Sequence, residues 1–145
     1  MRVWTHDRFT FPLPAGHKFP IDKYRLLREE VERWPGVEVL ESEPVSWEDL
    51  ALVHSAELLH RIRYGELSVR EERGLGLPWS GELVERGRRS VGGTVCAARE
   101  TLRAGLGAAL GGGTYHAARD FARGYCLFND VAVAVAVLRR EGHAG

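Results

Sequence analysis

The feature that most constrains the fold is a short apolar run that ends in three consecutive glycines. Residues 106–110 carry only Leu, Ala and Gly, and Gly111, Gly112 and Gly113 follow directly. A run of this length is typical of a buried strand in a parallel sheet. Glycines allow a sharp turn after such a strand, where α/β proteins place their active sites. His116 lies in the same loop, so we expect it at the mouth of the sheet.

The flanking patterns predict an alternation of strands and helices. Apolar periodicity, serine caps and terminal glycines indicate helices at residues 21–34, from Ser46, at 55–64 and from Ser80 to Gly105. Strands are expected at residues 2–6 and at 37–40, the latter with alternating exposure. Residues 9–20 hold three prolines and read as a loop that packs on the body. This order favours an α/β domain with a mostly parallel sheet.

Two further features of the helices can be tested. The helix that begins at Ser80 carries a predicted buried stripe, formed by Val84, Val91, Val95, Ala98 and Leu102. Its adjacent glycines, residues 92–93, each cost about 1 kcal/mol relative to alanine, so we expect close packing there. Residues 131–138 alternate valine with mostly alanine, which by periodicity alone could form a strand. The cap Asn129-Asp130 favours a helix, and we expect it to be buried on several sides.

Composition sets the class of protein. With 145 residues, 44% hydrophobic and 28% charged, the chain fits one domain spanning residues 1–145. A formal net charge of zero indicates neither a nucleic-acid partner nor an anionic membrane surface. The chain lacks an export signal and a long apolar run, so we expect a cytoplasmic protein with reduced, buried Cys96 and Cys126. Absence of glutamine alongside abundant Arg and Glu is typical of thermophiles.

His116 is the candidate proton carrier. A neutral imidazole, with a pKa of ~6.5, can accept a proton and return it. The alternative is a loop histidine held by backbone hydrogen bonds. The three glycines could also suggest a phosphate-binding loop, but neither the dinucleotide spacing nor a following Gly-Lys-Ser/Thr is present.

Several segments together resemble the zinc-dependent histone deacetylase and acetylpolyamine amidohydrolase superfamily, in particular bacterial class IV-like acetoin-utilisation proteins. They are GHKFPIDKY (16–24), DLALVH (49–54), EERGLGLPWS (71–80), SVGGT (90–94), GGGTYHA (111–117) and GYCLFND (124–130). The resemblance implies the arginase–deacetylase type of α/β fold, of which this chain is similar to the N-terminal portion. It implies that the substrate is an acetylated amine, such as acetyl-lysine or an acetylpolyamine.

The resemblance also implies site residues. His116 matches the second histidine of a catalytic pair, and Gly113, Gly124 and Tyr125 match the wall of the substrate channel. The alternative for Gly124 and Tyr125 is a turn glycine and a core aromatic. Cys126 is expected to be a small buried side chain.

Tyr115 stands where the family has the first histidine of the pair. A phenol cannot act as a base at neutral pH, but it can donate a hydrogen bond. Either Tyr115 positions the attacking water or an oxyanion, with His116 as sole base, or it marks weakened chemistry. Four of the other histidines, His17, His54, His60 and His143, are expected to be structural or exposed, with His17 nearest the site.

The family's zinc ligands, an Asp-x-His element and a later Asp, have no match in residues 1–145. We therefore expect no Zn²⁺ on this chain alone and no deacetylase activity from it, although the full-length family uses Zn²⁺. An open sheet edge is expected to drive self-association or to bind a complementary C-terminal half. The rival hypothesis is a non-catalytic interaction module that pairs with itself or with another subunit.

Overall fold

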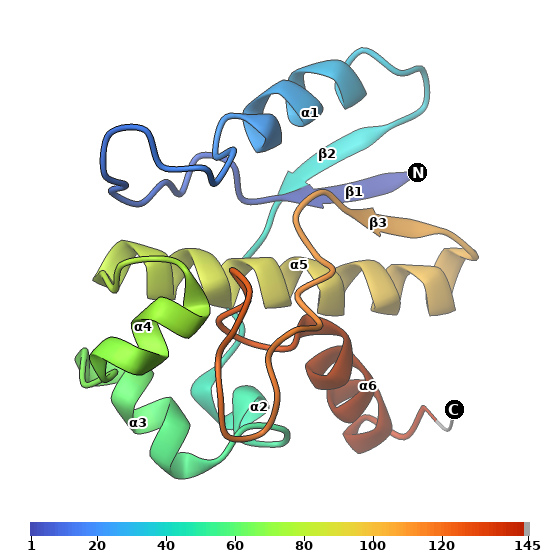
Figure 1. Ribbon diagram of the computed structural model, residues 1–145. Coiled ribbons are helices and arrows are strands. Elements are labelled where there is room, and N and C mark those ends of the chain that lie inside the picture. Colours follow the sequence, from blue (N-terminus) through green and yellow to red (C-terminus); the bar gives the residue numbers. More distant parts are fainter. Residues whose placement is uncertain (144–145) are drawn as a thin grey trace.

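Three parallel strands form the sheet of this computed structural model, which describes residues 1–143. The strands β1 (Arg2–Thr5), β2 (Glu38–Glu41) and β3 (Gly107–Ala109) are arranged in the order β2-β1-β3. Val3 pairs with Val39 on one side and with Ala108 on the other. Helix α1 (Lys23–Val31) lies on one face and α5 (Gly81–Ala104) on the other (Figure 1). The predicted α/β class with a parallel sheet is confirmed.

The sheet has two different edges. β2 carries Glu38 and Glu41 at its ends, both exposed, whereas Val39 and Leu40 between them are half-buried. Over the predicted residues 37–40 the exposure alternates from Val37 to Val39 but not at Leu40, because an edge strand is partly open on both faces. Charged side chains on an edge oppose pairing with another strand. β3 consists only of glycine and alanine and has no such protection.

The 24-residue α5 organises the fold. The Ser80 hydroxyl accepts a hydrogen bond from the Leu83 backbone N–H at 3.0 Å, and Gly105 ends the helix with a φ of 84°. Val84, Val91 and Val95 are buried as predicted, but Ala98 is half-buried and Leu102 is exposed. The last turns instead bury Ala97 and Glu100, because β3 crosses the helix there: an added Cβ on Gly107 would lie 2.5 Å from the Ala97 carbonyl oxygen.

The paired glycines of α5 allow the chain after β2 to touch the helix. A Cβ on Gly92 would lie 1.9 Å from the carbonyl oxygen of Glu43, and one on Gly93 would lie 2.6 Å from the Ser42 hydroxyl oxygen. The predicted close packing at residues 92–93 is confirmed. The loop of residues 9–20 also packs on the body as predicted, since Phe11 is buried in the core.

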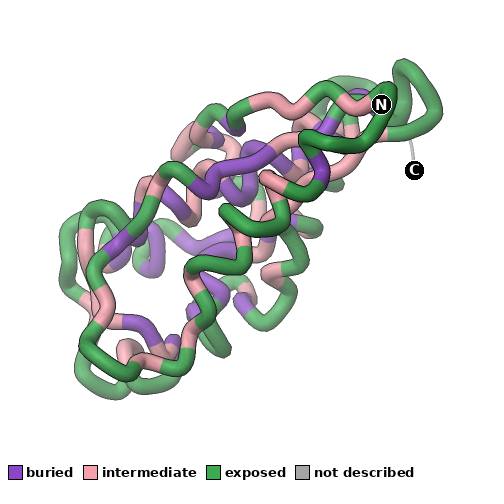
Figure 2. The backbone as a smooth tube through the Cα atoms, turned by 90° about the horizontal axis from the view of Figure 1, so that it is seen from above, coloured by how far each residue is buried: buried purple, intermediate pink, exposed green. Residues whose placement is uncertain are grey.

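A group of short helices packs beside the N-terminal half of α5 (Figure 1). They are α2 (Trp47–Leu50), α3 (Ala56–Tyr64) and α4 (Val69–Leu75). Ser46 and Ser55 cap α2 and α3 as expected. Helix α4 was not among the expected elements, although its first turn has a capping box: Ser68 and Glu71 hydrogen-bond to each other's backbone N–H groups. Buried segments run through the centre of the fold and exposed ones surround them (Figure 2).

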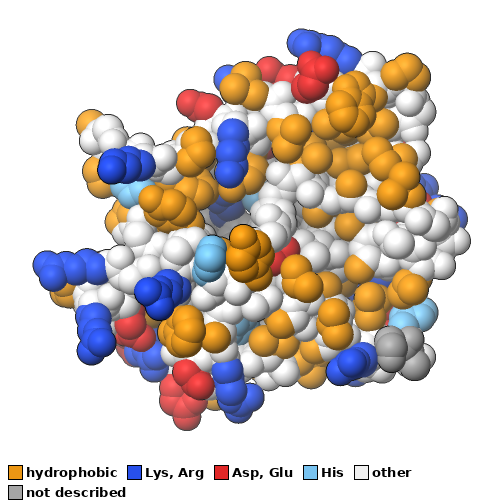
Figure 3. All heavy atoms as spheres, turned by 45° about the vertical axis from the view of Figure 1, so that its right-hand side comes forward, with side chains coloured by type: hydrophobic (Ala, Val, Ile, Leu, Met, Phe, Trp, Pro, Cys, Tyr) orange, Lys and Arg blue, Asp and Glu red, His pale blue; other side chains and the backbone are white. Residues whose placement is uncertain are grey.

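The last helix, α6 (Asp130–Arg140), packs against α5 and also contacts α2. Val133 and Val137 are fully buried, but Val131 and Val135 are 49% and 44% exposed. The helix is confirmed, whereas its expected burial on several sides is wrong for residues 1–143, because no described element covers the face that carries Val131 and Val135. Hydrophobic side chains gather on the side that carries β3 and α6 (Figure 3). No helix within the described range is long and apolar enough to cross a membrane.

Candidate functional site

A single buried carboxylate, that of Asp130, holds the loop after β3. Its Oδ2 accepts hydrogen bonds from the Gly113 backbone N–H at 2.8 Å and from the Thr94 hydroxyl at 2.6 Å. Its Oδ1 accepts from the Thr114 backbone N–H at 2.7 Å and from the Thr114 hydroxyl at 2.8 Å. Asp130 is fully buried at the start of α6. One side chain therefore ties the loop, α5 and α6 together.

The glycines of this loop are needed because other groups approach their backbone closely. A Cβ on Gly111 would lie 2.0 Å from His6 Cε1, and one on Gly112 would lie 2.7 Å from Asp130 Oδ2. Gly113 has a φ of 86°, in the left-handed region that favours glycine. The N–H groups of Gly113 and Thr114 already donate to Asp130, so they cannot serve a phosphate. The phosphate-loop alternative is therefore not supported.

His116 and Tyr115 are both exposed at the end of this loop. Their ring centroids are 4.7 Å apart, and Tyr115 is 67% exposed. The His116 ring packs on the backbone of Gly124, where an added Cβ would lie 3.3 Å from it. Within residues 1–143 no group hydrogen-bonds to the His116 imidazole or to the Tyr115 hydroxyl. The loop thus presents an accessible imidazole against a glycine, and the two roles proposed for Tyr115 stay open.

Gly124 and Tyr125 form a tight turn that is anchored on the C-terminal end of α4. The backbone N–H of Gly124 donates to the Gly74 carbonyl at 3.1 Å, and that of Tyr125 donates to the Leu75 carbonyl at 2.7 Å. Tyr125 has a φ of 66°, a strained conformation for a bulky residue. Such strain persists only where the surroundings enforce it, and it is frequent at functional sites.

The Tyr125 ring belongs to an aromatic wall, which consists of His17, Phe19 and Tyr125. Its centroid lies 5.3 Å from that of Phe19 and 6.4 Å from that of His17. Gly76 admits the ring, because a Cβ there would lie 2.9 Å from Tyr125 Cε1. Tyr125 remains 43% exposed, so it is not a core aromatic. Gly124 contacts His116 and precedes Tyr125 in the chain, so Gly124, Tyr125 and His116 lie together. Gly113 is also exposed, but its recorded contact is the hydrogen bond to Asp130.

His17 and His54 hold backbone segments of the site. His17 Nδ1 accepts from the Phe19 N–H at 3.0 Å, which leaves its Nε2 to donate to the Gly76 carbonyl at 3.1 Å. His54 Nδ1 donates to the Ala118 carbonyl at 2.8 Å, and its Nε2 accepts from the Asn129 N–H at 3.0 Å. Burial lowers the pKa of His54, so it stays neutral. The prediction of structural roles is confirmed for both.

The structure also shows the exposure of two further histidines and of both cysteines. His60 and His143 are exposed, as expected. Cys126 is buried and burial raises the pKa of its thiol, so it is a small core side chain rather than a nucleophile. Cys96 is only half-buried, which contradicts its expected burial, because it flanks the buried face of α5.

Sequence reasoning missed two residues behind the loop. His6 and Arg86 line a cavity of about 50 Å³ that also touches Thr114 and Tyr125. Burial, followed by the nearby Arg86 charge, lowers the pKa of His6 to about 3. The helical position of Arg86 suggested only an exposed charge, and no local signal marks its burial. Asp130 was also missed. As an acid at the start of an apolar helix it could be recognised from the sequence as part of a helix cap, but its contacts with the loop could not.

The described residues do not by themselves fit a zinc site. Zinc requires about three nitrogen, sulfur or carboxylate ligands. No group of three or more His, Cys, Asp or Glu side chains in residues 1–143 is arranged to hold a metal ion. Asp130 lies near the loop, but both of its oxygens already accept hydrogen bonds.

Comparisons with known proteins agree on one family. The histone deacetylase domain matches residues 17–144. An uncharacterized protein of Picosynechococcus sp. is 33% identical over 144 residues, which are 96% of this chain and 47% of that protein. The acetoin utilization protein AcuC of Bacillus subtilis is 33% identical over 106 residues, which are 66% of this chain and 27% of AcuC. The chain thus spans less than half the length of these relatives.

Solved structures give the same result. An HDAC homolog from Aquifex aeolicus superposes with a TM-score of 0.72 at 26% identity, covering 97% of this chain and 41% of that one. The HD domain of HDA15 gives a TM-score of 0.75 at 22% identity, over 97% and 43% of the two chains, which shows the shared fold. The fold, the order of the motifs and the family match together place this chain in the histone deacetylase domain family.

Proposed function

We propose that the chain is the N-terminal part of a zinc-dependent deacetylase that hydrolyses an acetylated amine. The observation that carries the proposal is the exposed His116 imidazole, packed on Gly124 beside the aromatic wall. This arrangement follows the carboxyl end of β3, where α/β enzymes assemble their sites. Membership of the histone deacetylase domain family supports the same reaction class.

Each residue of the site has a definite task in this proposal. His116 takes a proton from the attacking water and returns it to the departing amine nitrogen. The aromatic wall contacts the methylene stem of the substrate and excludes water. Asp130 fixes the loop that carries His116. Tyr115 lies beside His116 and its hydroxyl can donate a hydrogen bond to the water or to the oxyanion.

Zinc ligands would have to come from outside residues 1–143, and the two sheet edges support a position for them. β2 is protected by Glu38 and Glu41, whereas β3 is small, uncharged and open. A groove beside β3 is lined by Ala98, Thr101 and Val131, among others. A further polypeptide that pairs with β3 and covers α6 would reach the loop of His116. We propose that this polypeptide is a complementary deacetylase half. The cytoplasmic location of the protein stays a prediction.

The open β3 edge and the exposed face of α6 equally favour the second candidate, a non-catalytic module that binds itself or another subunit.

The experiment that separates the deacetylase from the non-catalytic module is an assay on an acetyl-lysine peptide and on an acetylated polyamine, with added zinc. The protein is assayed alone and then together with a complementary C-terminal half. The deacetylase proposal expects no turnover from the chain alone, and turnover by the complex that is lost in His116→Ala. Turnover by the complex that survives His116→Ala would contradict the role of His116. A stable complex without turnover would favour the interaction module.

A further inference from the structure

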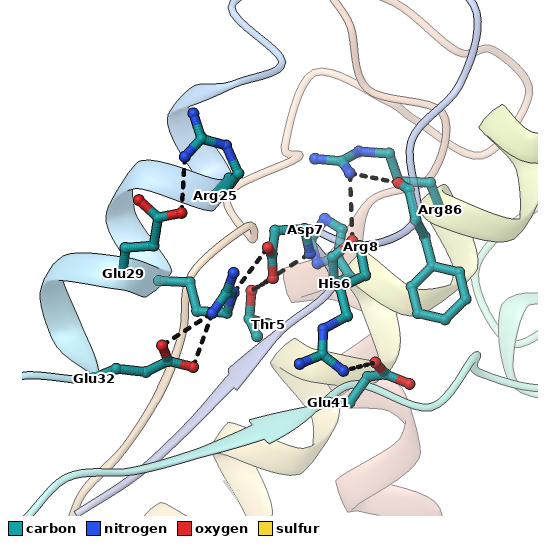
Figure 4. A network of polar contacts seen from close by, with 11 residues as sticks. Thr5, His6, Asp7, Arg8, Arg25, Glu29, Glu32, Glu41 and Arg86 are labelled. Atoms are coloured by element: carbon teal, nitrogen blue, oxygen red, sulfur yellow. Dashed lines mark hydrogen bonds and ion pairs between the residues drawn. The ribbon is translucent and has the colours of Figure 1, made fainter.

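Arg86 is a buried cation without an anionic partner among residues 1–143. It projects from α5, and the residue is only 4% exposed. Its Nη1 donates to the Phe9 carbonyl at 2.6 Å and to the His6 carbonyl at 3.4 Å (Figure 4). Its Nη2 is buried and makes no hydrogen bond within the described part of the chain. Burying an incompletely bonded charge is unfavourable unless something else satisfies it.

The neighbouring groups do not neutralise this charge. The Asp7 carboxylate hydrogen-bonds to the Thr5 hydroxyl at 3.0 Å and pairs with Arg28 at 2.8 Å, and in Figure 4 it points toward α1. His6 is uncharged near neutral pH, since its pKa is lowered to about 3 by burial. The Tyr24 ring lies 4.4 Å from the guanidinium carbon of Arg86 and stabilises the cation, but it supplies no anion.

Arg86 borders a cavity large enough for a small chemical group. The cavity measures about 50 Å³, whereas one water molecule needs roughly 10–15 Å³. Apart from Arg86, its walls are mostly aromatic and aliphatic, with Phe11, Leu83 and Phe128 among them. Tyr125 of the aromatic wall and Thr114 of the His116 loop also line it. The cavity therefore lies directly inward of the candidate site.

We propose that this cavity receives the far end of the substrate's acyl group and that Arg86 binds a carboxylate there. The substrate class is then an amine that carries a short dicarboxylic acyl group, such as malonyl or succinyl. This inference rests on the proposed amide hydrolysis. Water oxygen bonds to the acyl carbon, the C–N bond breaks, and the amine leaves with a proton from His116. The products are a free amine and a dicarboxylate. The unbonded Nη2 suits this task because it can donate a charge-assisted hydrogen bond to a carboxylate oxygen while Nη1 keeps its two carbonyl partners.

A binding experiment tests the proposal without turnover. The purified protein is titrated calorimetrically with N-methylsuccinamate and with N-methylsuccinamide, which has nearly the same shape but a neutral end. One charge-assisted hydrogen bond predicts on the order of 10–100-fold tighter binding of the carboxylate. Equal affinity of the two probes overturns the proposal. Because hydrolysis is not measured, this failure would leave the proposed deacetylase function standing.

Variants and a third probe complete the test. Arg86→Met should abolish the preference for the carboxylate, Arg86→Lys should retain part of it, and the exposed Arg63→Met should retain all of it. Circular dichroism checks that Arg86→Met folds, since Nη1 also holds two carbonyls. If it does not fold, the comparison of the two probes on the unaltered protein still decides. Acetate that binds as tightly as N-methylsuccinamate would show a site for free small carboxylates and would overturn the acyl-chain assignment.

Discussion

Substitution of Asp130 tests whether this one carboxylate holds the candidate site. In Asp130→Asn the shape is kept, but an NH₂ group replaces one of the two oxygens. In the unaltered protein the Gly113 N–H and the Thr94 hydroxyl donate to Oδ2 at 2.8 Å and 2.6 Å. If Nδ2 takes the place of Oδ2, these two donors face another donor. A hydrogen bond to a charged group contributes about 1.5–3 kcal/mol, and a buried donor left without an acceptor costs about 1–3 kcal/mol. We expect a loss of about 3 kcal/mol in the free energy of unfolding.

The measurement is urea or thermal unfolding monitored by circular dichroism. For a chain of this size a loss of about 3 kcal/mol lowers Tm by roughly 10 °C. Asp120→Asn is the matched control, because Asp120 lies exposed in the same connection and accepts no hydrogen bond within residues 1–143. It should change stability by less than about 0.5 kcal/mol. Equal effects of the two substitutions would refute the role given to Asp130.

Three further outcomes follow from the packing. Gly92→Ala should destabilise the fold by about 3 kcal/mol or more, because its Cβ would lie 1.9 Å from a backbone oxygen. The control Gly74→Ala in α4 has open space around its Cβ and should stabilise the fold by about 0.5–1 kcal/mol. Equal free energies of unfolding for the two variants would contradict this. His6 binds a proton in the unfolded state near pH 6.5 but in the folded state only near pH 3, so stability should fall as the pH drops through this window, by roughly 2–3 kcal/mol at pH 4.5. His6→Gln should flatten that dependence in pH-resolved denaturation, and the exposed His60→Gln should not. Val135→Glu on the open face of α6 should reduce self-association in light scattering, while Leu26→Glu on α1 should leave it unchanged; an identical mass for both variants would exclude α6 from the interface.

Local patterns predicted most of the secondary structure. The serine caps at residues 46, 55 and 80 and the terminal glycines at 65 and 105 specify helix ends by short-range hydrogen bonding and backbone conformation. Helix α4 follows the same rule through Ser68 and Glu71. It was missed although its local signal was present. The limits of the buried stripe on α5 could not be predicted, because they depend on where β3 crosses that helix.

The candidate site was predictable only in part. The motifs around His116 and Gly124 indicated which loops matter, and the structure brings these two residues into contact. The clamp by Asp130 joins residues 17 positions apart, and the burial of Arg86 depends on carbonyls 77 and 80 positions away. Contacts of this kind arise from the tertiary arrangement of α5, α6 and β1, and no local pattern encodes them.

The position of Asp130 at the first turn of α6 links assembly to chemistry. Val131, on the open face of that helix, is its immediate neighbour in the chain. A polypeptide docking on this face would press on the same turn whose carboxylate aligns the His116 loop. Binding of any polypeptide at this face would therefore also change the orientation of the imidazole, so assembly and the geometry of the His116 loop are thermodynamically coupled.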